Sequence, residues 1–308
     1  MKIIFMGTPE FAAESLKGLI EAGHEISLVV TQPDREKGRG KKLQMSPVKE
    51  LALEKGLEVF QPERIKTEEA LGELFKYEAD IYVVAAFGQI LSREILEHPR
   101  YGCINVHASL LPLYRGAAPI QWSIIDGRKE SGVTIMQMAE GLDTGDMIAR
   151  TIVPIEAQDT GDSLHDKLAA AGARLLVLAL KDIEEGRAVF EKQRDEDSCY
   201  AKKLTKELGR LDFNLDCLYL DRLIRGLNSW PGAYTGLDGK TLKIWKARPL
   251  AGEKRQAGEI FGTKEGRLCI GCKDGAIEVE ELQLEGKKRM DTGSFLRGYQ
   301  IEEGRILA

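Results

Sequence analysis

Two polar side chains interrupt an apolar strand pattern near the middle of this 308-residue chain. Residues 103–107 read Cys-Ile-Asn-Val-His, so Asn105 and His107 alternate with β-branched residues. Because the side chains of a strand alternate between its faces, Asn105 and His107 share one face. Open α/β sheets bind ligands at the carboxyl ends of strands that are otherwise apolar on both faces. The pair therefore favours a functional site, although a strand end with satisfied hydrogen bonds is the plainer alternative.

The residues that follow extend the pattern. Ser109-Leu-Leu-Pro112 and Arg115-Gly116 come next, and Gly141-Leu-Asp-Thr-Gly-Asp146 lies further along the chain. Asn-x-His followed by Ser-Leu-Leu-Pro-x-x-Arg-Gly resembles the signature of the folate-dependent formyltransferases. The resemblance implies that Asn105, His107 and Asp143 are the catalytic residues and that 10-formyltetrahydrofolate is the formyl donor.

These three residue types suit a direct acyl transfer between two bound substrates. Asn105 can donate an N–H to the oxygen that gains charge in the tetrahedral intermediate. His107 can carry protons between the attacking amine and the leaving nitrogen, or stabilise the oxyanion as an imidazolium, and Asp143 can support either role. The sequence has no nucleophile elbow, no His-Glu-x-x-His and no Ser or Cys with a matched base, which argues against a covalent acyl-enzyme.

A folate pocket is expected beside the catalytic residues. Residues 81–86 are continuously apolar, as in a buried parallel strand, and the loop after them should lie next to the end of the 103–107 strand. The apolar members of this loop could equally be plain core. The resemblance implies that folate contacts the following residues: Phe87, Gln89, Ile90, Leu91, Ser109, Leu110, Leu111 and Pro112.

The remaining elements predict an α/β fold that is followed by a small β domain. Residues 2–6 and 26–30 alternate with helical segments, as in a Rossmann-like, mostly parallel sheet, but the Gly-x-Gly-x-x-Gly fingerprint of dinucleotide binding is absent. A long helix begins near Asp162 and ends near Gly186, with a predicted apolar stripe of Leu164, Leu168, Leu175 and Leu178. About five short strands follow residue 230, with turns at Asp238-Gly239 and Asp274-Gly275. We predict a catalytic domain over residues 1–190, a linker over 191–205 and an OB-like β-barrel over 206–308.

A basic loop is predicted between residues 31 and 42. Its cations are spaced by two glycines, which suits either a solvated surface loop or a finger that neutralises phosphate. This loop and two later segments, 201–210 and 228–235, resemble those members of the family that formylate initiator methionyl-tRNA. The resemblance implies that tRNA contacts Arg35, Lys37, Arg39, Lys41 and Lys42, and that the C-terminal barrel binds tRNA as well.

Composition narrows the remaining possibilities. The net charge of the chain is −5. Residues 1–204 contain 33 acidic and 26 basic residues, whereas residues 205–308 contain 16 acidic and 18 basic residues. The second part is therefore slightly positive and accepts a polyanion more easily. The longest apolar runs are too short for a membrane span, and five scattered cysteines suit a reducing compartment. We expect a cytoplasmic, monomeric protein without a metal, since Cys269-Ile-Gly-Cys272 has no further zinc ligands nearby.

Three other functions stay open at this stage. A related enzyme would formylate a small amine, such as a glycinamide nucleotide or an amino sugar, but that would leave the basic loop and the barrel unexplained. A hydrolase would pass the formyl group of the folate to water. A folate-binding or RNA-binding module without turnover would not require Asn105, His107 and Asp143 together.

Overall fold

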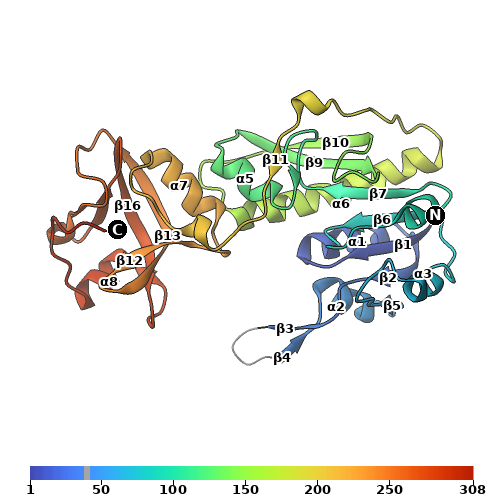
Figure 1. Cartoon of the computed structure of the whole chain (residues 1–308), viewed down its shortest axis with the longest axis horizontal. Helices are drawn as coiled ribbons and strands as arrows, with labels where there is room; N and C mark the ends of the chain where they lie inside the picture. Colours follow the sequence, from blue (N-terminus) through green and yellow to red (C-terminus); the bar gives the residue numbers. More distant parts are fainter. Residues whose placement is uncertain (38–41, 308) are drawn as a thin grey trace. The chain divides into compact units, whose positions relative to one another are not determined.

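The computed structural model describes residues 1–37 and 42–307, so Arg39 and Lys41 lie outside the described residues (Figure 1). The chain divides into two compact units. Unit 1 consists of Met1–Pro119, Glu130–Pro154 and His165–Ala201, and unit 2 consists of Ile120–Lys129, Ile155–Leu164 and Lys202–Ala308. The predicted order, an α/β part followed by a β part, is confirmed.

A seven-stranded sheet forms the centre of unit 1. Its order is β10-β9-β7-β6-β1-β2-β5. The pairs among the last five strands are parallel, whereas β9 and β10 run antiparallel, so the predicted mostly parallel sheet is confirmed. The strands are β1 (Lys2–Gly7), β2 (Glu25–Val30), β5 (Val59–Phe60), β6 (Ile81–Ala85), β7 (Cys103–His107), β9 (Glu130–Gln137) and β10 (Met147–Pro154).

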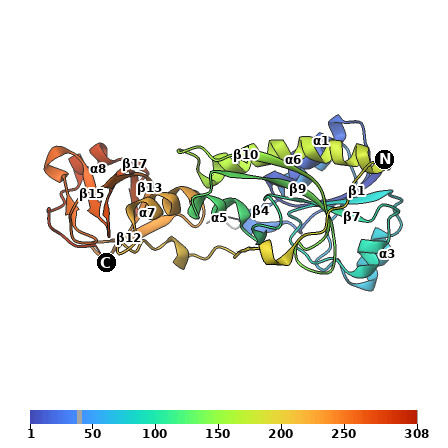
Figure 2. The ribbon, with the colours of Figure 1, turned by 90° about the horizontal axis from the view of Figure 1, so that it is seen from above.

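Helices cover both faces of this sheet (Figure 2). The helix α1 (Glu10–Glu21) packs against α6 (Gly161–Glu184) through Gly18 and Ala173, and α2 (Pro47–Glu54) packs beside α1. The short helices α3 (Glu68–Leu74) and α4 (Arg93–Glu97) contribute Leu74, Ile95 and Leu96 to the core on the other face. Burial on both faces explains why these strands are continuously apolar.

The alternation along β7 determines where its polar side chains lie. Cys103 belongs to the core under α3 and α4, whereas Val106 packs near Gly172 of α6. Asn105 and His107 therefore extend the face of Cys103. The helix α4 has only five residues and covers the beginning of this face, so the polar pair lies at the carboxyl end of the strand beyond the core.

The segment predicted as a loop over residues 31–42 contains a hairpin. Its strands β3 (Arg35–Lys37) and β4 (Lys42–Gln44) pair antiparallel, with Lys37 opposite Lys42. The base is held by polar contacts: Asp34 accepts from Lys49 at 2.6 Å and from Gln61 at 2.8 Å. The hairpin follows β2, so it leaves the sheet at the carboxyl edge, as do the loops after β6 and β7.

Unit 2 is built around an antiparallel half-barrel, which confirms the small β domain predicted after the α/β part. The sheet order is β12-β13-β16-β15-β14, and β17 pairs with β16. The elements are α5 (Pro119–Ile125, with Pro119 itself in unit 1), α7 (Cys217–Gly226), β12 (Ala233–Leu237), β13 (Lys240–Ala251), β14 (Ile260–Phe261), β15 (Leu268–Gly271), β16 (Gly275–Leu284), β17 (Met290–Asp291) and α8 (Thr292–Gly298). The turn at Asp238-Gly239 joins β12 to β13, with positive φ at both residues, as a tight hairpin requires.

Two segments from earlier in the chain, Ile120–Lys129 and Ile155–Leu164, complete unit 2. Arg222 of α7 donates to the carbonyl of Ile125 at 3.0 Å, and Arg225 donates to the carbonyl of Asp159 at 2.8 Å. The domain boundaries at residues 190 and 206 stay a prediction. Within the described ranges, no helix is both long and apolar enough to cross a membrane.

The long helix α6 allows a test of its packing face. Leu168 is fully buried, whereas Leu178, which the sequence placed on the same stripe, exposes 61% of its surface; the buried stripe continues through Leu176 and Leu180. Leu168→Ala should lower the free energy of unfolding by about 2–5 kcal/mol, because a cavity replaces the side chain. Leu178→Ala should change it by less than about 0.5 kcal/mol. Urea unfolding of both variants measures the difference, and equal losses would contradict this packing.

Candidate active site

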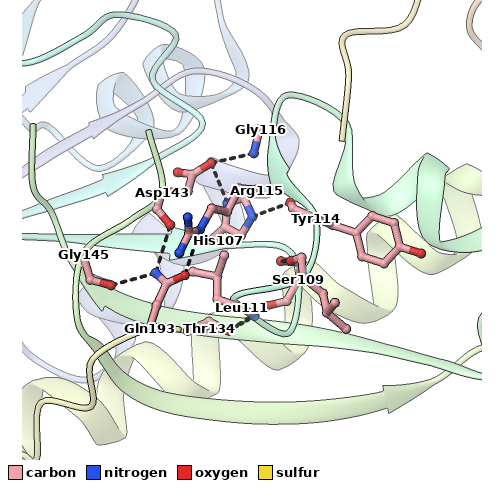
Figure 3. A network of polar contacts seen from close by, with 11 residues as sticks. His107, Ser109, Leu111, Tyr114, Arg115, Gly116, Thr134, Asp143, Gly145 and Gln193 are labelled. Atoms are coloured by element: carbon pink, nitrogen blue, oxygen red, sulfur yellow. Dashed lines mark hydrogen bonds and ion pairs between the residues drawn. The ribbon is translucent and has the colours of Figure 1, made fainter. Parts of the chain in front are cut away.

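The imidazole of His107 is fixed by a backbone carbonyl. Its Nε2 lies 3.0 Å from the carbonyl oxygen of Tyr114, in the loop that follows β7 (Figure 3). A carbonyl can only accept a hydrogen bond, so Nε2 carries the hydrogen and Nδ1 is the nitrogen that can gain or lose a proton. Only 7% of the His107 side chain is exposed, which excludes most water from the ring.

The carboxylate of Asp143 faces this second nitrogen. Its Oδ2 lies 3.7 Å from Nδ1 of His107 and accepts a hydrogen bond from the backbone N–H of Gly116 at 2.8 Å. The Asp143 side chain is 11% exposed. The structure therefore brings His107 and Asp143 together. The N–H of Gly116 holds the carboxylate beside the ring, where the carboxylate can stabilise positive charge on the imidazole.

Asn105 lies two residues before His107 on the same face of β7. The strand rise of about 3.3 Å per residue separates their Cα atoms by about 7 Å. Asn105 pairs with Val84 of β6 and Met136 of β9 through the backbone, and it is half-buried. Within residues 1–37 and 42–307 its amide makes no hydrogen bond to another residue, so both its donor and its acceptor are available to a ligand.

The loop 109–113 is closed on itself by a buried threonine. Thr134 of β9 donates to the carbonyl of Ser109 at 2.7 Å and accepts from the N–H of Leu111 at 3.1 Å, while Ser109 donates to the carbonyl of Leu113 at 2.6 Å. Leu111 packs with Met136 and Met147 in a small core. Of the predicted folate contacts in this loop, Ser109 and Leu111 are buried, and Leu110 and Pro112 are half-buried.

The loop 87–91 also contains both buried and exposed members of the predicted folate contacts. Phe87 and Leu91 belong to the core under α3 and α4, with 2% and 6% of their surface exposed. The amide of Gln89 holds the segment 62–65, accepting from the N–H of Ile65 at 2.8 Å and donating to the carbonyl of Pro62 at 3.0 Å. Ile90 is 72% exposed, so it is the member of this loop whose side chain is open to a ligand.

The predicted tRNA contacts are only partly described. Arg35 lies at the base of the hairpin and donates to Gln32 at 3.5 Å. It lines a hollow of about 380 Å³ together with Thr8, Pro33 and Ser46. For Lys37 and Lys42 the structure describes the strand pairing, and Arg39 and Lys41 lie outside the described residues.

Two polar residues that complete the site were not singled out from the sequence. The amide of Gln193 donates to the carbonyl oxygens of Asp143 and Gly145, at 2.9 and 2.7 Å, and accepts from Nε of Arg115 at 3.0 Å. Gln193 lies in the segment that was predicted to be a linker. No periodicity, turn residue or charge pattern marks a glutamine in that context, and Arg115 was noted only as part of the family signature, without a role of its own.

Comparison with known proteins places the chain in a family. Residues 1–180 match the formyl transferase family, and residues 203–300 match the formyl transferase C-terminal domain. A methionyl-tRNA formyltransferase of Agathobacter rectalis is 53% identical over 305 residues, which cover 99% of this chain and 98% of that protein. One of Lachnospira eligens is 52% identical over 313 residues, covering 100% and 99%. The chain belongs to the methionyl-tRNA formyltransferase family.

Solved structures share the fold of this family at low identity. The N-formyltransferase of Helicobacter canadensis, in complex with folinic acid and dTDP-3-aminofucose, is 21% identical with a TM-score of 0.69 and covers 91% of this chain and 98% of its own. HypX of Aquifex aeolicus, in complex with tetrahydrofolic acid, is 20% identical with a TM-score of 0.66 and covers 100% of this chain and 50% of its own.

The buried threonine that closes the loop after β7 can be tested directly. Thr134→Val keeps the size of the side chain but leaves the N–H of Leu111 and the carbonyl of Ser109 without partners. Each buried group left unpaired should cost about 1–3 kcal/mol of folding free energy. Thr151→Val on the neighbouring strand β10 is the matched control and should cost much less. Urea unfolding of both variants provides the measurement, and equal stability would show that Thr134 does not hold the loop.

Proposed function

We propose that the chain transfers the formyl group of 10-formyltetrahydrofolate to the amino group of the methionyl moiety of initiator methionyl-tRNA, by direct acyl transfer. Full-length similarity to methionyl-tRNA formyltransferases supports formyl transfer to methionyl-tRNA as the reaction. The observation that carries the mechanism is the buried His107–Asp143 pair, whose orientation is fixed by the Tyr114 carbonyl and the Gly116 N–H.

The chemistry requires a proton to leave the attacking amine and a proton to reach the departing nitrogen. His107 can accept the first through Nδ1, because Nε2 is occupied by the Tyr114 carbonyl. As Nδ1 takes up the proton, the ring becomes an imidazolium next to the Asp143 carboxylate, 3.7 Å away. The carboxylate stabilises that charge in a site from which most water is excluded, so the ring can hold the proton and pass it on.

Asn105 is suited to a second role. During transfer the formyl oxygen gains negative charge, and an amide N–H aimed at that oxygen stabilises the transition state more than the ground state. The amide of Asn105 has no other partner among the described residues and lies on the face of His107. Asn105 and His107 can therefore act on the same bound group.

The folate donor supplies the formyl carbon that the amine attacks. A flat pterin with polar edges fits the carboxyl ends of β6 and β7, because the loops 87–91 and 109–112 both leave the sheet there. Phe87, Gln89, Leu91, Ser109 and Leu111 have side chains committed to the core or to other backbone groups. We propose that these residues contact folate through their main chain, and that Ile90, Leu110 and Pro112 supply apolar surface.

The acceptor must be positioned by contacts remote from its amine. We propose that the basic segment 31–42, with Arg35, Lys37, Arg39, Lys41 and Lys42, contacts the acceptor end of the tRNA, since it follows β2 at the same sheet edge as the catalytic residues. We propose residues 1–190 as the catalytic domain, 191–205 as the linker and 206–308 as a tRNA-binding domain. The proposed tRNA-binding domain has cationic side chains beside an aromatic ring: Lys243 and Arg289 lie 5.4 and 5.0 Å from the ring centre of Trp245. Such a combination suits nucleic-acid binding.

The reaction and the catalytic roles can be tested together. Purified protein, 10-formyltetrahydrofolate and charged initiator tRNA should yield formylmethionyl-tRNA. His107→Ala and Asn105→Ala should each reduce kcat by roughly 10²–10³, because a proton carrier or an oxyanion donor is lost.

Three comparisons complete this test. His98→Ala is the matched histidine control, since the ring of His98 stacks on Phe75 at 3.9 Å and lies 6.2 Å from the ring of Tyr82, near the start of β6, and it should leave kcat unchanged. Near-full activity of the His107 or Asn105 variant would exclude the corresponding role. Release of formate at the same rate without tRNA would favour a hydrolase instead.

The contribution of the basic segment 31–42 should appear in the salt dependence of tRNA binding. Replacing Arg39, Lys41 and Lys42 by Gln should lower affinity and reduce the slope of log K against log salt by about 2–3, since each lost phosphate contact contributes about 0.7–0.9. The matched control replaces Lys17, Lys55 and Lys76, which pair with glutamates on helices or at a helix end, and removes the same net charge. Identical slopes for both triple variants would show that this segment does not contact phosphate.

A further inference from the structure

The segment 191–201, which we call the strap, lies along the candidate active site. At its beginning, Glu191 and Met147 exchange two backbone hydrogen bonds of 2.8 and 2.9 Å. Towards its end, the carbonyl of Cys199 accepts from the N–H of Arg115 and the carbonyl of Ala201 accepts from the N–H of Ala117, both at 2.9 Å. The strap thus ends in β11 (Tyr200–Ala201), which pairs with β8 (Arg115–Gly116) directly after the His107 loop.

Gln193 is the strap residue whose side chain contacts the backbone of Asp143. Both hydrogens of its amide are used, one on the carbonyl of Asp143 and one on the carbonyl of Gly145 (Figure 3). Its oxygen accepts from Nε of Arg115, whose Nη1 in turn donates to Asp195 of the strap at 2.9 Å. Arginine only donates and carbonyls only accept, so the orientation of the amide is determined by its three partners.

Asp143 needs such support because its backbone conformation is unfavourable. Its φ of +53° lies in the left-handed region, which is unfavourable for a residue that carries a Cβ. The backbone after it is also closely packed, since a Cβ on Gly145 would lie 1.7 Å from the carbonyl oxygen of Gln137. The two hydrogen bonds from the Gln193 amide stabilise this turn and offset the unfavourable backbone conformation of Asp143.

We propose that Gln193 is a positioning residue for the formyl transfer, acting through Asp143. By holding the carbonyls on either side of Thr144, it fixes the turn from which the Asp143 carboxylate reaches His107 and the N–H of Gly116. Gln193 lies between the two matched family segments, 1–180 and 203–300, and outside both. The inference rests on the role proposed above for Asp143.

Two substitutions separate the contacts of Gln193. Gln193→Glu keeps the shape and the acceptor for Arg115, but places a carboxylate oxygen 2.7–2.9 Å from two carbonyl oxygens. Gln193→Met keeps the length and removes all three hydrogen bonds. Each should lower kcat by roughly 10–10², the effect of misplacing a catalytic group by about 1 Å. The KM for methionyl-tRNA and for the folate donor should change less than about twofold, because Gln193 contacts neither.

A double-mutant cycle with Asp143→Asn tests whether Gln193 acts through Asp143. If it does, Gln193→Glu combined with Asp143→Asn should be no slower than Asp143→Asn alone, and both single variants should alter the pH dependence of kcat in the same way. Arg194→Ala is the control on the strap, since the Arg194 side chain is 71% exposed and its ion pairs among the described residues are with the neighbouring Glu196 and Asp197. It should retain wild-type kcat, and thermal unfolding should show all variants folded at the assay temperature.

Several results would overturn the proposal. Multiplicative losses in the double variant would mean that Gln193 acts independently of Asp143. Full activity of Gln193→Glu with loss in Gln193→Met would assign the effect to Arg115. Wild-type kcat for Asp143→Asn would remove the role of Asp143, and the role of Gln193 with it, while formylation of methionyl-tRNA by the wild type would still support the proposed reaction.

Discussion

The hydrogen bond from the Gly116 N–H to the carboxylate of Asp143 is the contact on which the site depends. It joins two loops that are 27 residues apart and fixes the carboxylate beside the imidazole of His107. The strand β7 ends at His107, whereas its antiparallel partner β9 ends at Gln137, opposite Ile104 near the start of β7. The segment after Gln137 therefore folds back along β7 to bring Asp143 beside His107. The carboxyl end of β7 thus supplies the amide and the imidazole, and the segment that returns after β9 adds the carboxylate.

Much of this arrangement could be predicted from the sequence because it is encoded locally. Alternation of Asn105 and His107 with β-branched residues predicted the strand and the shared face, and the paired strands confirm both. The turn at Asp238-Gly239 was predicted equally well, because its positive φ angles favour those two residues. The family relationship is likewise confirmed by full-length similarity, whereas the roles of individual site residues stay predictions.

The features that could not be predicted depend on contacts between distant segments. Leu178 fits a helical stripe as well as Leu176 does, and only the packing of α6 decides that Leu176 is buried and Leu178 is 61% exposed. Residues 35–44 lack an apolar pattern, so pairing between Arg35–Lys37 and Lys42–Gln44 gave no local signal. The amide of Gln89 holds the segment between Pro62 and Ile65, a contact between distant segments that no local pattern indicates.

Gln193 shows that a charged, aperiodic stretch can carry specific contacts. The strap contributes almost no apolar burial, so hydrophobic periodicity cannot reveal it, yet its backbone and one amide satisfy carbonyl and N–H groups of both active-site loops. Such groups, if buried and unpaired, would each cost about 1–3 kcal/mol. The left-handed Asp143 and the loop at Arg115 therefore require a third segment that carries hydrogen-bonding groups at fixed positions. The chain provides it after α6, so the geometry of the site is complete only when residues beyond 190 have folded onto it.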